Sequence, residues 1–179
     1  MVFTSWDEES ALIVDNEDKG FSVTNSQNQG LLRKLANRFE KSGDEYQGYS
    51  WWGVGGRWRK YVGEIFYGKY VYSATAIRSG NGVAQASWIL PLTKEGQYDV
   101  YVFIAKEKGE SDNEALGEYH YSIYHDDGVD KVTVNTKEVD AGWVLLGTYF
   151  CTPGNAKVVI SNESNARVVI ADAVKAVLL

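Results

Sequence analysis

The sequence predicts a mainly β protein: an antiparallel, jelly-roll-like β-sandwich with one short N-terminal helix. Runs in which β-branched and aromatic residues alternate with polar ones recur through the last third of the chain, from Tyr119 to Leu179. Clusters of Gly, Asn, Asp and Ser close each run, and successive runs begin roughly 8 to 12 residues apart. This spacing is typical of sandwiches built from antiparallel strands.

Two elements are expected before this region. A short strand is expected over 11–15, and the helix is expected over 30–40, where Gly43 follows as a stop signal. The helical stretch has four apolar side chains at helical spacing on one face: Leu31, Leu32, Leu35 and Phe39. A stripe of this kind packs against a core, so we expect the helix to cover part of the sandwich.

Eight further strands follow from the same alternation. They are expected over 69–77, 82–89, 97–105, 118–125, 131–135, 142–150, 156–160 and 167–170. Strand 97–105 has apolar or aromatic side chains on nearly both faces, which predicts a central place in its sheet. The charged, Gly-containing stretch 106–117 is typical of an exposed loop.

Single polar or reactive residues among these strands are expected to be structural. Residues 171–174 form a terminal strand interrupted by Asp172, which must find hydrogen-bond donors because an unpaired buried charge is costly. Cys151, the one cysteine of the chain, is expected to be a small buried hydrophobe. Trp88 and Trp143 lie in alternating runs and are expected in the core.

Several short motifs occur in one order along the chain. They are Tyr121 to His125 with Gly128, Val132 to Val134, Trp143 to Phe150, and Val169 to Val174, preceded by segments 13–21, 66–68, 73–74, 86–88 and 96–101. In these motifs the chain, from about Leu12 onward, resembles the golvesin C-terminal domain and the similar module of bacterial xanthan lyases. The resemblance implies a carbohydrate-binding-like domain that accompanies a larger protein.

Length and composition agree with one folded domain over 11–179, preceded by a polar leader or linker end over 1–10. A chain of 179 residues buries enough surface to fold without a metal or disulfide. The net charge of −6 disfavours nucleic acid and anionic lipid as partners, and no apolar stretch approaches membrane-spanning length. The resemblance implies a secreted, periplasmic or cell-surface location, with any signal peptide outside this sequence.

The aromatic-rich stretch 46–72 is the best candidate for a binding site. Sugars present flat C–H faces and many hydroxyls, so a sugar site combines aromatic rings with planar donors such as arginine. The expected ligand-binding residues are Trp51, Trp52, Arg57, Trp58, Arg59 and Tyr61. Together they predict a shallow platform for a polysaccharide or oligosaccharide, on which acidic sugars gain from the arginines.

The same residues leave an alternative open. If residues 51 and 52 are extended, their indoles point in opposite directions, so one fills the core and the other faces out. Exposed tryptophans also mark surfaces that pack against another domain. The partner is then an attached domain of the parent protein instead of a glycan.

The two histidines do not form a catalytic or metal site in this reading. His120 and His125 are five residues apart on one strand and therefore lie on opposite faces. The segment 126–128 reads as a turn, although its carboxylates leave a structural Ca²⁺ open as an alternative. We expect no catalytic residues, no other metal and no cofactor.

The sequence therefore predicts a noncatalytic accessory module of a larger extracytoplasmic protein. Its expected role is carbohydrate binding through an aromatic platform. The alternative is a structural module that packs against an attached catalytic domain.

Overall fold

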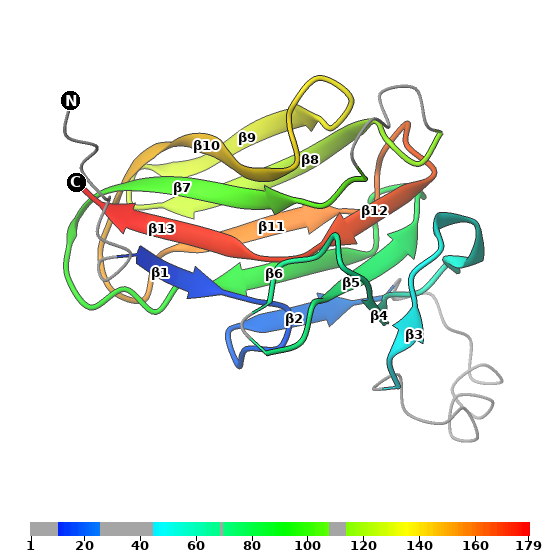
Figure 1. Ribbon diagram of the computed structural model, residues 1–179. Helices are drawn as coiled ribbons and strands as arrows, with labels where there is room; N and C mark the ends of the chain where they lie inside the picture. Colours follow the sequence, from blue (N-terminus) through cyan, green and yellow to red (C-terminus); the bar gives the residue numbers. More distant parts are fainter. Residues whose placement is uncertain (1–10, 26–44, 69, 108–113) are drawn as a thin grey trace, which may run out of the picture.

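A computed structural model describes residues 11–25, 45–68, 70–107 and 114–179. The predicted mainly β, antiparallel sandwich is confirmed in this part of the chain (Figure 1). The expected leader over 1–10 and the expected helix over 30–40 lie outside the described residues.

Thirteen strands in the described residues form three sheets. Sheet A has the order β1 (Ala11–Val14), β13 (Val174–Leu178), β7 (Gly96–Ile104) and β10 (Gly142–Cys151). Sheet B has the order β2 (Phe21–Thr24), β6 (Gln85–Ile89), β11 (Lys157–Ser161), β8 (Glu118–His125) and β9 (Gly128–Asn135). Sheet C has the order β12 (Val168–Ala171), β5 (Ser73–Arg78), β4 (Arg59–Val62) and β3 (Gln47–Gly48).

Sheets A and B lie one over the other, and the chain passes repeatedly between them (Figure 1). Along the chain, β6 of sheet B is followed by β7 of sheet A. Likewise β9 of sheet B is followed by β10 of sheet A, and the next strand, β11, is again in sheet B. Such repeated crossing is the connectivity expected of a jelly-roll-like sandwich. Every strand pair is antiparallel except the short contact between β3 and β4.

The core lies between sheets A and B. Strand β7 is central in sheet A, as predicted, and its inward side chains from Tyr98 to Ile104 are at most 3% exposed. Across the sandwich, alternate residues of β8 face inward, and the buried hydroxyl of Tyr119 donates to the carbonyl oxygen of Val168 at 3.0 Å. The backbone N–H of Ile170 donates in turn to this hydroxyl at 3.2 Å, which ties sheet B to β12.

The predicted places of the single tryptophans and the cysteine are largely confirmed. Trp88 and Cys151 are each 1% exposed, and burial raises the pKa of the thiol to about 11. The expectation for Trp143 was wrong, because it is only half-buried. Its ring packs against Phe103 and Tyr67 on the outer face of sheet A, at centroid distances of 5.3 and 5.2 Å.

The terminal strand predicted over 171–174 is in fact a change of sheet. β12 pairs with β5 in sheet C, whereas β13 pairs with β1 and β7 in sheet A. Asp172 and Ala173 form the link between the two strands, and the backbone N–H of Phe103 donates to the carbonyl oxygen of Ala173 at 2.9 Å. The residue that interrupts the apolar run is therefore the point where the chain turns between sheets.

Asp172 is almost completely buried at this link, with 2% of its surface exposed. Its Oδ2 accepts the backbone N–H of Tyr67 at 3.1 Å, and its backbone carbonyl accepts the indole N–H of Trp88 at 3.2 Å. Burial disfavours the ionised form and raises the pKa of the carboxyl well above its ordinary value. The structural role predicted for Asp172 agrees with these contacts.

We expect Asp172→Ala to lower the free energy of unfolding by about 1–3 kcal/mol, because the N–H of Tyr67 loses its acceptor inside the core. Thermal melting and urea unfolding measure this loss. Asp172→Asn is the matched control, since its amide oxygen keeps the acceptor and no ionisable group remains. Equal stability of the alanine variant and the wild type would contradict the structural role.

Candidate functional site

A pair of stacked indoles forms the most exposed part of the predicted platform. Trp51, Trp52 and Gly53 make one short 3-10 turn, which follows β3 and precedes β4. The two ring centroids are 3.9 Å apart with an angle of 29° between the planes. Trp52 is 59% exposed, whereas Trp51 is partly buried against the core.

The opposite orientation considered for an extended segment does not apply, because residues 51–53 form a 3-10 turn. Such a turn rotates the chain about an axis, so neighbouring side chains diverge less than on a strand. Glycine follows at Gly53, Gly55 and Gly56, and a Cβ built at the first two meets no atom within 4 Å. The backbone beside the indoles is thus open enough for a ligand to approach.

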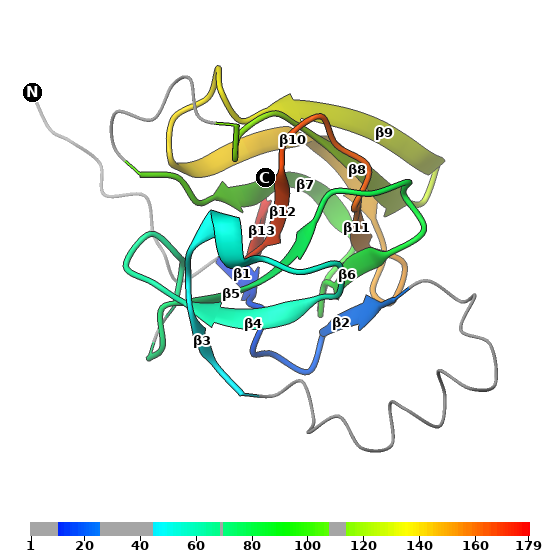
Figure 2. The ribbon, with the colours of Figure 1, turned by 90° about the vertical axis from the view of Figure 1, so that its right-hand side faces the viewer.

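Arg167 supplies the cation beside the indole pair. Its guanidinium carbon lies 4.5 Å from the ring centroid of Trp52 and 5.9 Å from that of Trp51. The guanidinium therefore lies over the ring of Trp52 and closer to it than to the ring of Trp51. Figure 2 shows the helical turn between β3 and β4 beside β12, the strand that Arg167 immediately precedes.

The other predicted aromatic residues of the site do not face this surface. Trp58 is 5% exposed and Tyr61 is 2% exposed, and both belong to the buried core cluster. Their side chains pack into the core below residues 51–62. The backbone N–H of Trp58 donates to Asn25 Oδ1 at 3.1 Å. An open platform that includes Trp58 or Tyr61 therefore disagrees with their burial.

Three other arginines lie on the segment that follows the 3-10 turn or on a strand that bonds to that segment. Arg57 and Arg59 are half-buried on the segment that leads into β4. Arg78, exposed at the end of β5, donates its backbone N–H to the carbonyl oxygen of Gly55 at 2.7 Å. Sequence reasoning missed Arg78 and Arg167, because nothing in their local sequence indicates that strand pairing brings them to the tryptophans. We call Trp51, Trp52, Arg78 and Arg167 the tryptophan platform.

The histidines are separated as predicted. His120 lies on the outer face of sheet B, where its Nδ1 is 3.0 Å from Thr133 Oγ1. His125 points to the other side, with 8% of its side chain exposed and its Nε2 3.6 Å from Asp130 Oδ1. The turn role predicted for 126–128 fits the structure, since Asp126 Oδ1 accepts the backbone N–H of Thr152 at 3.1 Å.

No cluster of three or more His, Cys, Asp and Glu side chains placed to bind a metal ion exists in the described part of the chain. The same residues contain no helix long and apolar enough to cross a membrane.

A hollow of about 270 Å³ near the β1–β2 turn is lined by acidic and tyrosine side chains. Asp15 lines it with Glu17, and Glu17 Oε2 pairs with Lys60 Nζ at 2.9 Å. Asp15 is 9% exposed, and its Oδ1 has no hydrogen-bond partner in the described structure. Burial raises the pKa of this carboxyl from 3.8 to about 6, against an opposing hydrogen bond from the backbone of Asn16.

Comparison with known proteins gives the class of this domain and then its family. Its fold is that of a β-sandwich module. Residues 42–178 match the family model of the Golvesin C-terminal domain, and the chain belongs to this family. The family suggested by the motifs is thereby confirmed.

A solved structure has the same fold. A Paenibacillus xanthan lyase is similar with a TM-score of 0.67 and 20% sequence identity. The similarity covers 96% of this chain but only 13% of the lyase chain, so the fold corresponds there to one small part of a much larger enzyme. No curated protein sequence matches the chain. Family and fold together indicate an accessory module of a larger protein.

The raised pKa of Asp15 predicts a pH-dependent stability. The folded protein binds the Asp15 proton more tightly than the unfolded chain does. The contribution of this proton to the free energy of unfolding is therefore complete below about pH 4 and is lost as the pH rises through about 6. The difference between the two pKa values of Asp15 sets an upper limit on the order of 3 kcal/mol for this loss in the free energy of unfolding. Urea unfolding at pH 4 to 7 should show this loss in the wild type and a smaller one in Asp15→Asn.

The exposed carboxylate of Asp127 provides the control for that comparison. Asp127→Asn should keep the wild-type pH profile, because the side chain lies in solvent. Parallel profiles for Asp15→Asn and the wild type would show that burial of Asp15 does not control the pH dependence.

Proposed function

We propose that this protein is a noncatalytic accessory module of an extracytoplasmic protein and that it binds carbohydrate on the tryptophan platform. The observation that carries the proposal is the stacked pair of indoles, in which Trp52 is 59% exposed and has the Arg167 guanidinium beside it. A flat, solvent-facing indole matches the C–H face of a pyranose ring.

The arginines favour acidic sugars as the ligand. Arg167 lies over Trp52, and the Arg78 guanidinium reaches Gly56, where a Cβ would stand 3.6 Å from one of its nitrogens. A guanidinium binds a carboxylate through two parallel hydrogen bonds. The net charge of −6 opposes an anionic ligand only weakly, because physiological salt screens charges beyond about 8 Å.

Two further considerations support this assignment. The similar solved structure is an enzyme named for xanthan, a polysaccharide, and the present fold corresponds to a small part of that enzyme. The groups that a hydrolase or transferase would use are poorly placed here, since the Cys151 thiol is buried with a pKa raised to about 11 and the His125 ring is also buried. We therefore assign the chain a binding role and leave catalysis to an attached domain.

The alternative role is packing against an attached domain of the parent protein. Besides Trp52, the described residues expose Tyr70 at 97% and Tyr72 at 60%. Large exposed aromatic side chains are common where two domains meet. The two roles make opposite predictions for the isolated module, because a packing surface shows no affinity for glycans.

We expect Trp52→Ala to weaken binding of an acidic polysaccharide about tenfold, the effect of losing roughly 1.4 kcal/mol of ring contact. Xanthan and alginate are the acidic probes and dextran is the neutral one, with tryptophan fluorescence and calorimetry as readouts. Trp51→Ala should weaken binding too, because Trp51 supports the exposed ring from behind. Arg167→Gln should weaken acidic probes selectively.

Tyr72→Ala is the matched control for these variants. It removes an exposed aromatic side chain just before β5 begins, whereas Arg78 of the platform lies at the other end of that strand. Its affinity should equal that of the wild type. If no polysaccharide binds the wild type, or if folded Trp51→Ala and Trp52→Ala bind unchanged, the platform does not bind glycans and the packing role takes its place.

A further inference from the structure

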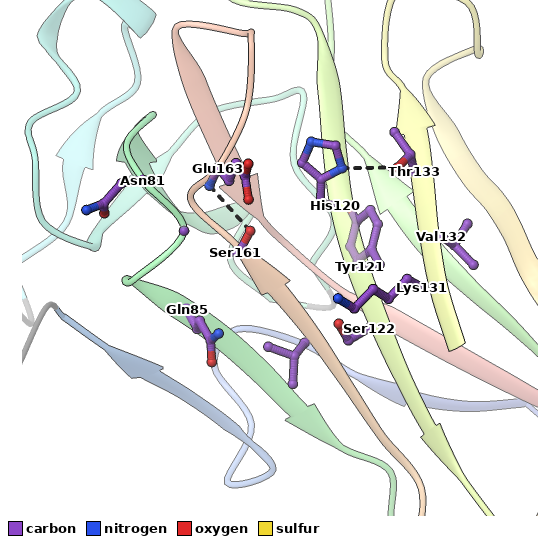
Figure 3. Close-up of a pocket in the computed structure, with 12 residues that line it drawn as sticks. Asn81, Gln85, His120, Tyr121, Ser122, Lys131, Val132, Thr133, Ser161 and Glu163 are labelled. Carbon is purple, nitrogen blue, oxygen red and sulfur yellow. Dashed lines mark hydrogen bonds between the residues drawn. The ribbon is translucent and has the colours of Figure 1, made fainter. Parts of the chain in front are cut away.

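The outer face of sheet B contains a groove of about 450 Å³ that the tryptophan platform does not use. Its walls come from β6, β8, β9 and β11 and from the loops that follow β5 and β11 (Figure 3). The polar side chains that matter most are Gln85, His120, Ser122, Lys131, Ser161 and Glu163. The five that lie on strands project from the solvent side of the sheet, because the alternate residues of these strands fill the core. Glu163 comes from the loop that follows β11.

Much of the hydrogen-bonding capacity of this groove is unused. Within the described structure, no hydrogen bond or ion pair involves the side chains of Gln85, Ser122 or Lys131. His120 uses its Nδ1 with Thr133 and keeps its other ring nitrogen. An amide, a hydroxyl, an ammonium group and an imidazole thus face one hollow with both donors and acceptors available.

The composition of the groove suits an uncharged polyhydroxyl ligand. Val159, 8% exposed, stands in one register row with Ser87 and Ser122 and supplies an apolar floor. Lys131 on β9 and Glu163 after β11 lie on different sides of the hollow and carry opposite charges. A sugar unit combines a C–H face with donor–acceptor hydroxyls, which matches this floor and these walls.

The groove and the tryptophan platform share a rim. The rim consists of the loop between β5 and β6 and the loop between β11 and β12, which are hydrogen-bonded to each other. The N–H of Ser79 donates to the carbonyl oxygen of Arg167 at 3.0 Å, and that of Gly80 donates to Asn162 at 2.7 Å. A Cβ on Gly80 would lie 2.3 Å from Asn162 Nδ2, so any larger residue here would displace the Asn162 side chain.

Each rim loop joins a residue of the groove to a residue of the tryptophan platform. The first loop begins beside Arg78 of the platform and contains Asn81, which lines the groove. The second contains Glu163, which lines the groove, and ends at Arg167 of the platform. The four Cα–Cα steps from Glu163 to Arg167 span at most about 14 Å even when the chain is fully extended. The two surfaces are therefore neighbours on one side of the molecule.

We infer that the groove on sheet B is a second saccharide site and that one polysaccharide chain crosses the rim between the two sites. Uncharged sugar units occupy the groove, while acidic units of the same chain rest on the platform beside Arg78 and Arg167. This inference rests on the proposed function, since it extends the ligand of the platform. It implies that an internal stretch of polymer is bound, with affinity that grows with chain length.

The test blocks the groove and the platform separately in the full chain. Ser122→Tyr fills the groove with a ring that suits an exposed strand position, so the fold is retained. Trp52→Ala removes the platform. Lys131→Ala removes one groove donor, and Lys137→Ala is its matched control, because it removes the same charge from an exposed turn residue that does not line the groove.

The probes are cellobiose, xylobiose and mannobiose together with xanthan fragments of at least about six sugars. NMR amide shifts should show at least one of the disaccharides at β8, β9 and β11 of the wild type and not of Ser122→Tyr. The long fragments should bind about tenfold more weakly to Ser122→Tyr and to Trp52→Ala alike, as expected when one of two linked contacts is lost. Lys137→Ala should bind like the wild type.

Different outcomes overturn the two proposals separately. If the fragments bind Ser122→Tyr as tightly as the wild type but lose affinity for Trp52→Ala, the groove is not a saccharide site and the platform stands. If Ser122→Tyr loses affinity while Trp52→Ala keeps it, the groove binds sugar but the crossing chain and the platform are wrong. If no probe binds the wild type, both proposals fail.

Discussion

The buried link between β12 and β13 is the constraint on which the arrangement of sheets depends. At Asp172 the chain leaves sheet C and enters sheet A, and the link also binds Trp88 of sheet B. All three sheets therefore meet within two residues. The backbone carbonyls of Asp172 and Ala173 accept from Trp88 and Phe103, and the Asp172 carboxyl accepts from Tyr67. A buried turn without such partners would cost several kcal/mol.

This junction also positions the surface on which we place binding. Because β12 pairs with β5, Arg167 and Arg78 come to neighbouring positions at one end of sheet C. The same pairing brings the two rim loops together, with the sheet B groove on one side and the stacked indoles on the other. The four residues of β12 thus connect the buried junction at Asp172 with Arg167 of the exposed tryptophan platform. Loss of the junction is expected to disturb both.

Local chemistry made part of the candidate site predictable. A segment rich in Trp and Gly indicates a loop that presents aromatic rings, and Trp52 is exposed accordingly. The roles of Trp58 and Tyr61 could not be inferred in this way, because the same aromatic side chain serves a core or a surface and only packing decides which. Arg167 was missed for a related reason: it is more than a hundred residues from Trp52 in the sequence, and pairing across sheets makes them neighbours.

The sequence by itself determined the class of fold, most strand positions and the family. Strand 118–125 and the central place of β7 follow directly from alternation, since a strand with one buried face must repeat every two residues. Short segments such as β2, β3 and β4 carry too few residues to show that period. Only the tertiary structure decided that 171–174 changes sheets, that the two indoles stack, and that arginines from distant strands lie beside them. Each of these depends on contacts between residues far apart in the chain, and local sequence does not encode such contacts.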